Sequence, residues 1–146
     1  MEELTIQVSP IEGLNLSQLV GIVPPCVKKL TISYFDKEPQ ASHCLLTNEC
    51  PPLPHILEHL TIKASLLKDI FSIIKIFKTH KSITVHLEDF NKRDVQDMLS
   101  LTHARRFIMA CDSDHISMIK QMRKDKRFRN VRQIVSRFKG GIERFN

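Results

Sequence analysis

A repeated tripeptide constrains the fold of this 146-residue chain more than any other feature of its sequence. Leu-Thr-Ile occurs at 4–6, 30–32 and 60–62, and the close copy Ile-Thr-Val occurs at 83–85. The copies start 26, 30 and 23 residues apart, which is the period of architectures that stack one strand-containing unit on the next. Two further strand-like apolar runs continue the series, at 107–111 and 131–135. The chain is therefore predicted to consist of similar consecutive units.

Two of these units share more than the tripeptide. Residues 24–32 and 54–62 both read proline, two residues, an aliphatic residue, two residues and Leu-Thr-Ile. The aliphatic residue is Val27 in the first unit and Leu57 in the second. Agreement in proline, aliphatic residue and tripeptide at the same spacing indicates an internal repeat rather than coincidence.

Helices are predicted between most of the strands. Apolar residues recur there with the 3.6-residue period of an amphipathic helix. The segments with this pattern are 16–23, 66–77, 91–101 and 113–122. Asn91 and Ser113 are expected to cap the helices that follow them, because their side-chain oxygens accept hydrogen bonds from free backbone N–H groups. Strands that alternate with helices are typical of an α/β fold with parallel strands and right-handed crossovers.

One connection breaks the alternation. The stretch 36–54 contains four prolines, and we expect it to be an irregular insertion without a helix. The remaining units follow one another without a linker, so the interpretation is a single domain over 1–139. Residues 140–146 begin with Gly140-Gly141 and are assigned to a C-terminal tail.

Two α/β architectures fit this order: a doubly wound parallel sheet, and a solenoid of strand–helix units with a curved parallel sheet. A doubly wound sheet is buried on both faces, so its strands are continuously apolar. Here polar and apolar residues alternate, which places them on opposite faces of each strand and favours the solenoid. We expect the polar residues to line the concave face and bind a partner: Thr5, Gln7, Thr31, Ser33, Thr61, Lys63, Thr84 and His86.

The units resemble leucine-rich repeats, whose core reads Leu-x-x-Leu-x-Leu. Residues 27–32 and 57–62 match this core in place, while 4–6 and 83–85 match its second half. The resemblance extends over most of 1–135. The Asn or Cys that the family carries three residues after the core is absent, and other residues stand there: Ser9, Phe35, Ser65 and Glu88.

Divergent repeats with Leu-Thr-Ile strands are similar to the substrate-recognition part of F-box proteins. This resemblance implies a non-catalytic protein-interaction module that selects substrates for a Skp1–cullin–F-box-type ubiquitin ligase. The chain contains no convincing F-box, so a Skp1-type adaptor is an expected partner only if an F-box lies outside these residues. A protein partner is expected in either case.

The charge distribution supports an alternative reading. The formal net charge is +6, and residues 120–146 carry ten Lys or Arg against two Asp or Glu. A basic segment of this kind is typical of proteins that bind acidic partners, including nucleic acids. The alternative function is therefore nucleic-acid binding through 120–139. The basic residues of this candidate interface are Arg123, Lys124, Lys126, Arg127, Arg129 and Arg132.

No motif for catalysis, cofactor binding or metal binding stands out. The four glycines form neither a dinucleotide-binding motif nor a phosphate-binding loop. His43, Cys44, Cys50 and His55 cluster in the insertion, but their spacing matches no zinc finger. Cys111 at a strand end is better explained as a buried thiol than as a nucleophile. We expect neither an enzyme nor a cofactor or metal site.

The sequence also bears on the compartment. The first residues are acidic and soon alternate, unlike a secretory signal. No apolar run reaches the length of about 18–20 residues that spans a bilayer. We therefore expect a cytoplasmic or nuclear protein with free thiols and no membrane association.

Overall fold

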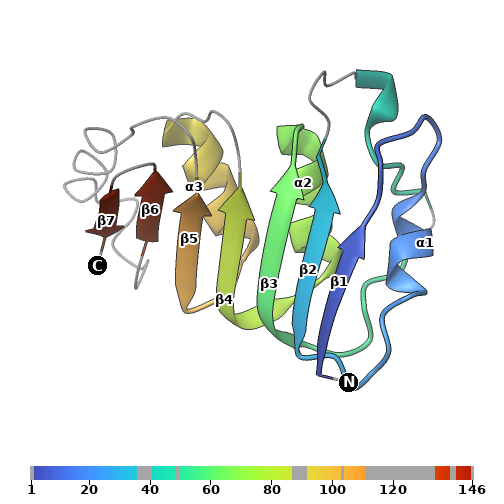
Figure 1. Ribbon diagram of the computed structural model, residues 1–146, viewed down its shortest axis with the longest axis horizontal. Coiled ribbons are helices and arrows are strands. Elements are labelled where there is room, and N and C mark those ends of the chain that lie inside the picture. Colours follow the sequence, from blue (N-terminus) through green and yellow to red (C-terminus); the bar gives the residue numbers. More distant parts are fainter. Residues whose placement is uncertain are drawn as a thin grey trace.

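The computed structural model describes residues 2–35, 41–48, 50–86, 92–102, 104–110, 134–138 and 141–145. The described strands form one sheet, in which they lie side by side in chain order (Figure 1). The strands are β1 (Glu3–Gln7), β2 (Lys29–Tyr34), β3 (Leu57–Ala64), β4 (Thr79–His86), β5 (Arg106–Ala110), β6 (Ile134–Phe138) and β7 (Gly141–Phe145). The helices are α1 (Leu16–Val20), α2 (Leu67–Ile76) and α3 (Lys92–Leu101), with a short 3₁₀ turn, η1 (Ala41–His43).

The first six strands pair in parallel, which confirms the predicted α/β class with a parallel sheet. Their order follows the chain without the reversal that marks the switch point of a doubly wound sheet. Strand β7 is the exception, because it pairs with β6 in the antiparallel direction. It lies within 140–146, the residues that the sequence analysis assigned to a tail. Strand β6 begins three residues later than the candidate strand at 131–135.

The tripeptide copies pair with one another in register. Leu30, Leu60 and Ile83 are neighbours on β2, β3 and β4, and Phe107 continues the row on β5. The next core row repeats the arrangement with Ile6, Ile32, Ile62, Val85 and Met109. The residues of these two rows are buried, which confirms the predicted core face. The register follows from the repeat because a slip by one residue would turn every apolar side chain to the other face.

The described helices cover this apolar face. Figure 1 shows α2 and α3 behind the strands, and α2 contacts both α3 and β3. Helix α2 buries Ile70, Ile73 and Ile74, the apolar stripe predicted from its period. Helix α1 adds Leu16 and Leu19 to the same core. The expected helix at 113–122 lies outside the described residues.

The described residues of the insertion between β2 and β3 include the short turn η1, and hydrogen bonds join them to the rest of the fold. The hydroxyl of Tyr34 donates a hydrogen bond to the carbonyl of His43 at 2.6 Å. Leu45 is buried, and its backbone N–H donates to a carboxylate oxygen of Asp69 on α2 at 2.8 Å. Burial raises the pKa of Asp69, whose side chain is only 1% exposed. These bonds anchor the insertion at the carboxyl end of β2 and at the start of α2.

Candidate binding surface on the sheet

The eight polar residues expected on the concave face lie together on the face of the sheet opposite the described helices. They form two rows, which we call the threonine rung and the lysine rung. The threonine rung consists of Thr5, Thr31, Thr61 and Thr84. The lysine rung consists of Gln7, Ser33, Lys63 and His86. We call this side of the sheet the polar face.

The threonine rung is a row of hydroxyl groups at the spacing of neighbouring strands, about 4.8 Å. Thr5 is exposed, and the other three threonines are half-buried. The polar row ends at β5, where Ile108 pairs with Thr84 and is 6% exposed. A hydroxyl both donates and accepts a hydrogen bond, so the rung provides hydrogen-bonding groups without net charge.

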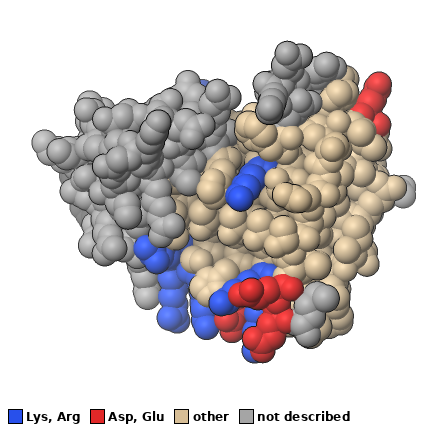
Figure 2. All heavy atoms as spheres, in the orientation of Figure 1, with Lys and Arg blue, Asp and Glu red and all other residues tan. Residues whose placement is uncertain are grey.

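Charge on the polar face is unevenly placed. Lys63 is exposed on the lysine rung and is flanked by Ser33 and His86. Figure 2 shows this face, with the middle of the described surface largely uncharged and charged side chains gathered near the starts of the strands. The polar face therefore combines a mainly neutral centre with a charged border.

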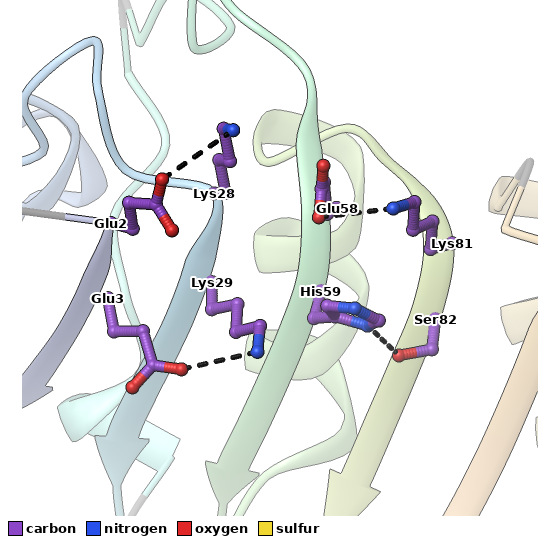
Figure 3. Close-up of polar contacts among 8 residues, drawn as sticks. All are labelled: Glu2, Glu3, Lys28, Lys29, Glu58, His59, Lys81 and Ser82. Carbon is purple, nitrogen blue, oxygen red and sulfur yellow. Dashed lines mark hydrogen bonds and ion pairs between the residues drawn. The ribbon is translucent and has the colours of Figure 1, made fainter.

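That border contains a third row, which the sequence analysis missed. We call it the histidine rung; it consists of Glu3, Lys29, His59, Ser82 and Arg106. Nδ1 of His59 and Oγ of Ser82 are 2.6 Å apart and share a hydrogen bond (Figure 3). The sequence contains a partial signal for this row. The position two residues before each threonine of the threonine rung is polar, and these positions are four of the five members of the histidine rung.

An irregularity in the pairing of β3 and β4 brings His59 and Ser82 together. Leu57 pairs with Thr79, but His59 pairs with Ser82, so β4 contains one extra residue in this interval. Bulges of this kind change which side chain faces the partner strand. Without the extra residue, the neighbour of His59 would be Lys81, whose charge would repel a protonated imidazole.

One ion pair lies within the histidine rung, and two more lie next to it. Nζ of Lys29 lies 3.3 Å from Glu3, and Nζ of Lys81 lies 3.2 Å from Glu58 (Figure 3). A third pair joins Lys28 and Glu2 at 3.7 Å. Exposed pairs of this kind contribute little to stability, so they orient charge more than they stabilise the fold.

Two ionisable side chains of this border, His59 and Glu58, have shifted pKa values. Partial burial lowers the pKa of His59, and the nearby Lys29 charge lowers it further. The hydrogen bond from Lys81 lowers the pKa of Glu58. His59 is therefore held in its neutral form at pH 7, while Glu58 is ionised.

Arg106 is the one residue of the histidine rung with an unsatisfied buried atom. Its Nε is buried, and no described residue accepts a hydrogen bond from it. None of the ion pairs between described residues includes Arg106. Ser82 is its neighbour on β4, so the donor lies beside the pair formed by Ser82 and His59.

A small hollow lies near the starts of the same strands, next to the ends of α2 and α3. Its volume is ≈ 150 Å³. Ile74, Ile83 and Leu101 form its apolar lining, while Lys75 and Lys78 contribute basic side chains. Ile83 belongs to the core row, so this hollow opens on the helix side of the sheet rather than on the polar face.

The remaining candidate sites from the sequence are not assembled in the described residues. Cys26, Cys44 and Cys50 are free thiols, and no three described His, Cys, Asp or Glu side chains lie close enough together to hold a metal ion. The six basic residues of the alternative nucleic-acid interface, between Arg123 and Arg132, lie outside the described residues, as does Cys111.

The chain was compared with protein-family models, curated proteins and solved structures, and none of them matches it. Within the part of the chain that the structure describes, every helix is too short or too polar to cross a bilayer.

Proposed function

We propose that the protein is a non-catalytic binding module that recognises a protein partner through the polar face of its sheet. The observation that carries the proposal is the in-register threonine rung, bordered by Lys63 and His86, on the face that the described helices leave uncovered. An extended row of polar side chains on a rigid sheet is the kind of surface that repeat proteins use for binding.

We propose further that the units form a solenoid of the leucine-rich-repeat kind. Three observations support this architecture: strands that follow chain order, parallel pairing from β1 to β6, and one core cluster formed with the helices of a single face. In such a solenoid each unit stacks only on its neighbours, and the sheet provides the recognition surface.

The composition of the polar face favours a protein partner over a nucleic acid. The threonine rung and the lysine rung together carry five hydroxyl groups, on four threonines and Ser33, and one lysine. Binding to a phosphate backbone needs several basic groups. The alternative, nucleic-acid binding through 120–139, relies on the sequence charge of that segment. The narrower hypothesis of substrate recognition in a ubiquitin ligase relies on the resemblance of the Leu-Thr-Ile units to F-box proteins.

Site-specific photocrosslinking tests the proposal. A photoreactive phenylalanine analogue placed at Thr61 on the polar face is expected to form protein adducts in cells. The same analogue at Lys68, an exposed position on α2, serves as the matched control. Adducts that form from Thr61 and not from Lys68 support the proposal. Adducts only from Lys68, or adducts to RNA in place of protein, contradict it.

Mass spectrometry of the Thr61 adducts also tests the narrower hypothesis. A ubiquitin-ligase role predicts that the crosslinked protein accumulates when the proteasome is inhibited. A crosslinked partner whose abundance does not respond to inhibition contradicts that role without affecting the proposal that the polar face binds a protein.

A further inference from the structure

The geometry points to a carboxylate-binding subsite at the histidine rung, formed by Arg106 and Ser82 with support from His59. We infer that it receives an acidic side chain of the protein partner. The inference rests on the proposed function in one respect, because it takes the polar face as the surface that meets the partner.

The buried Nε of Arg106 is the first observation. A buried N–H donor without an acceptor is rare in folded proteins, since it has lost its water and gained no partner. A guanidinium presents its N–H groups as a planar fork that matches the two oxygens of a carboxylate. Nε is closed to the outside, but Arg106 as a whole is only half-buried. A carboxylate placed above Arg106 would pair with this donor after a shift of the arginine side chain.

The hydrogen bond between His59 and Ser82 is the second observation. The 2.6 Å separation of Nδ1 and Oγ allows either group to donate. When Nδ1 carries the proton, Ser82 accepts from His59, and its own hydroxyl hydrogen is available to a ligand. A carboxylate beside Arg106 would favour this tautomer, because Ser82 then donates to it. His59 thus acts as a positioning residue that sets the direction of the serine hydroxyl.

The surrounding charges make Arg106 the available cation. The acidic residues of this border are already held by lysines: Glu3 by Lys29 at 3.3 Å and Glu58 by Lys81 at 3.2 Å. Arg106 forms no ion pair with a described carboxylate, and it lies next to Ser82 in the pairing of β4 and β5. Figure 3 shows the Glu3–Lys29 pair beside the bond between His59 and Ser82, and the Glu58–Lys81 pair above this bond on the same two strands. The open positive charge and the open hydroxyl are therefore adjacent.

The position of the subsite suits an extended partner segment. On β1 to β4 the histidine rung is two residues before the threonine rung, so the two rungs are about 7 Å apart along these strands. A partner chain that follows the polar face would place hydrogen-bonding groups on the threonines and one acidic residue over Arg106. The subsite would then set the register of the partner.

Binding of a labelled hexaglutamate peptide to the full chain tests this inference. Fluorescence anisotropy at low ionic strength is the measurement, because salt screens charge pairs of this kind. The unmodified protein should bind hexaglutamate more tightly than hexaglutamine. Arg106→Gln should weaken hexaglutamate binding by about tenfold or more, which corresponds to about 1.4 kcal/mol. Ser82→Ala should weaken it by a smaller factor, because it removes a neutral donor.

Two matched variants separate a specific subsite from general charge. Arg93→Gln removes an exposed arginine from α3 and should leave hexaglutamate binding within about twofold, since a distant exposed charge is screened. Arg106→Lys keeps the charge but loses the planar fork, and it should bind less tightly than the unmodified protein. Circular dichroism and urea unfolding establish that each variant is folded.

Several outcomes would overturn the subsite. These are equal binding of hexaglutamate and hexaglutamine, an Arg93→Gln variant that is as weak as a folded Arg106→Gln variant, and an Arg106→Lys variant that binds like the unmodified protein. Tighter binding of a uridine hexanucleotide that is lost in Arg106→Gln would replace the carboxylate by a phosphate and also overturns the inference. Photocrosslinking from Thr61 tests the proposed function by a separate measurement, so failure of the subsite can be told apart from failure of the proposed function.

Discussion

The two faces of the sheet are made by the same strands and have opposite properties. On β3, Leu60 and Ile62 are 1% and 0% exposed, while Thr61 between them is half-buried and Lys63 is exposed. The apolar residues pack under α2 and α3, and the polar residues lie in rows on the side that the described helices leave uncovered. The difference between the faces shows how one strand repeat places core residues on one side and polar residues on the other, because alternate side chains of a strand point to opposite faces.

The largest expected effect is on the apolar face. Replacing Leu60 by alanine should lower the free energy of unfolding by about 2–5 kcal/mol, because it removes buried methyl groups and leaves a cavity. Thr61→Ala should lower it by less than about 1 kcal/mol, as expected for a residue outside the core. Urea unfolding followed by circular dichroism measures both values. Equal destabilisation by the two variants would remove the distinction between the faces.

The next largest effect is expected at the hydrogen bond between Leu45 of the insertion and Asp69 of α2. Asp69→Ala should lower the free energy of unfolding by about 1–3 kcal/mol, since the buried N–H of Leu45 loses its acceptor. Asp69→Asn keeps an acceptor oxygen and should cost less than Asp69→Ala. Hydrogen exchange at the Leu45 amide provides a second measurement. Protection of this amide that is unchanged in Asp69→Ala would contradict the assignment.

The buried carboxyl group of Asp69 should also make the free energy of unfolding depend on pH. Burial raises its pKa in the folded protein, so the folded state disfavours the charged form more than the unfolded chain does. Its contribution is complete below the unfolded pKa of about 3.9 and declines as the pH rises through the folded pKa. Unfolding titrations at several pH values should therefore show a smaller loss of stability with rising pH in Asp69→Asn than in the unmodified protein. Parallel pH profiles for the two proteins would contradict this.

A smaller effect is expected on the polar face. The double variant Lys63→Ala with His86→Ala should unfold within about 0.5 kcal/mol of the unmodified protein, because neither position belongs to the core. It should weaken binding of the partner identified by crosslinking by about 1 kcal/mol or more, the level that marks an energetically important contact. Calorimetric titration measures the affinity. Unchanged affinity in the folded double variant would move the binding site away from the lysine rung.

The smallest effect is a titration at the border of the polar face. Partial burial and Lys29 keep the pKa of His59 below its usual value, and Lys29→Gln should raise that pKa by removing one positive charge. Because the charged form is disfavoured, the contribution of His59 to stability is lost as the pH falls through its folded pKa. Nuclear magnetic resonance of the imidazole carbon-bound protons follows the titration. A lower His59 pKa in Lys29→Gln would contradict the electrostatic assignment.

The sequence by itself determined the repeat, the two faces and the register between neighbouring units. Alternation within a strand is local, and repeated Leu-Thr-Ile segments align because any other register would expose their apolar side chains. The same reasoning predicted α2 and α3. It did not predict strand β7, since Gly141–Phe145 was judged by its adjacent glycines rather than by its pairing with β6.

Only the tertiary structure decided the contacts that join distant residues across an irregularity. The extra residue in β4 sets Ser82 rather than Lys81 beside His59, and no periodic pattern in the sequence indicates where such a bulge falls. The bond between Asp69 and Leu45 spans 24 positions and depends on how the insertion folds back over α2. The periodicity of a sequence indicates which side of a helix or strand is buried. These contacts depend instead on how several elements are placed relative to one another, and packing sets that placement.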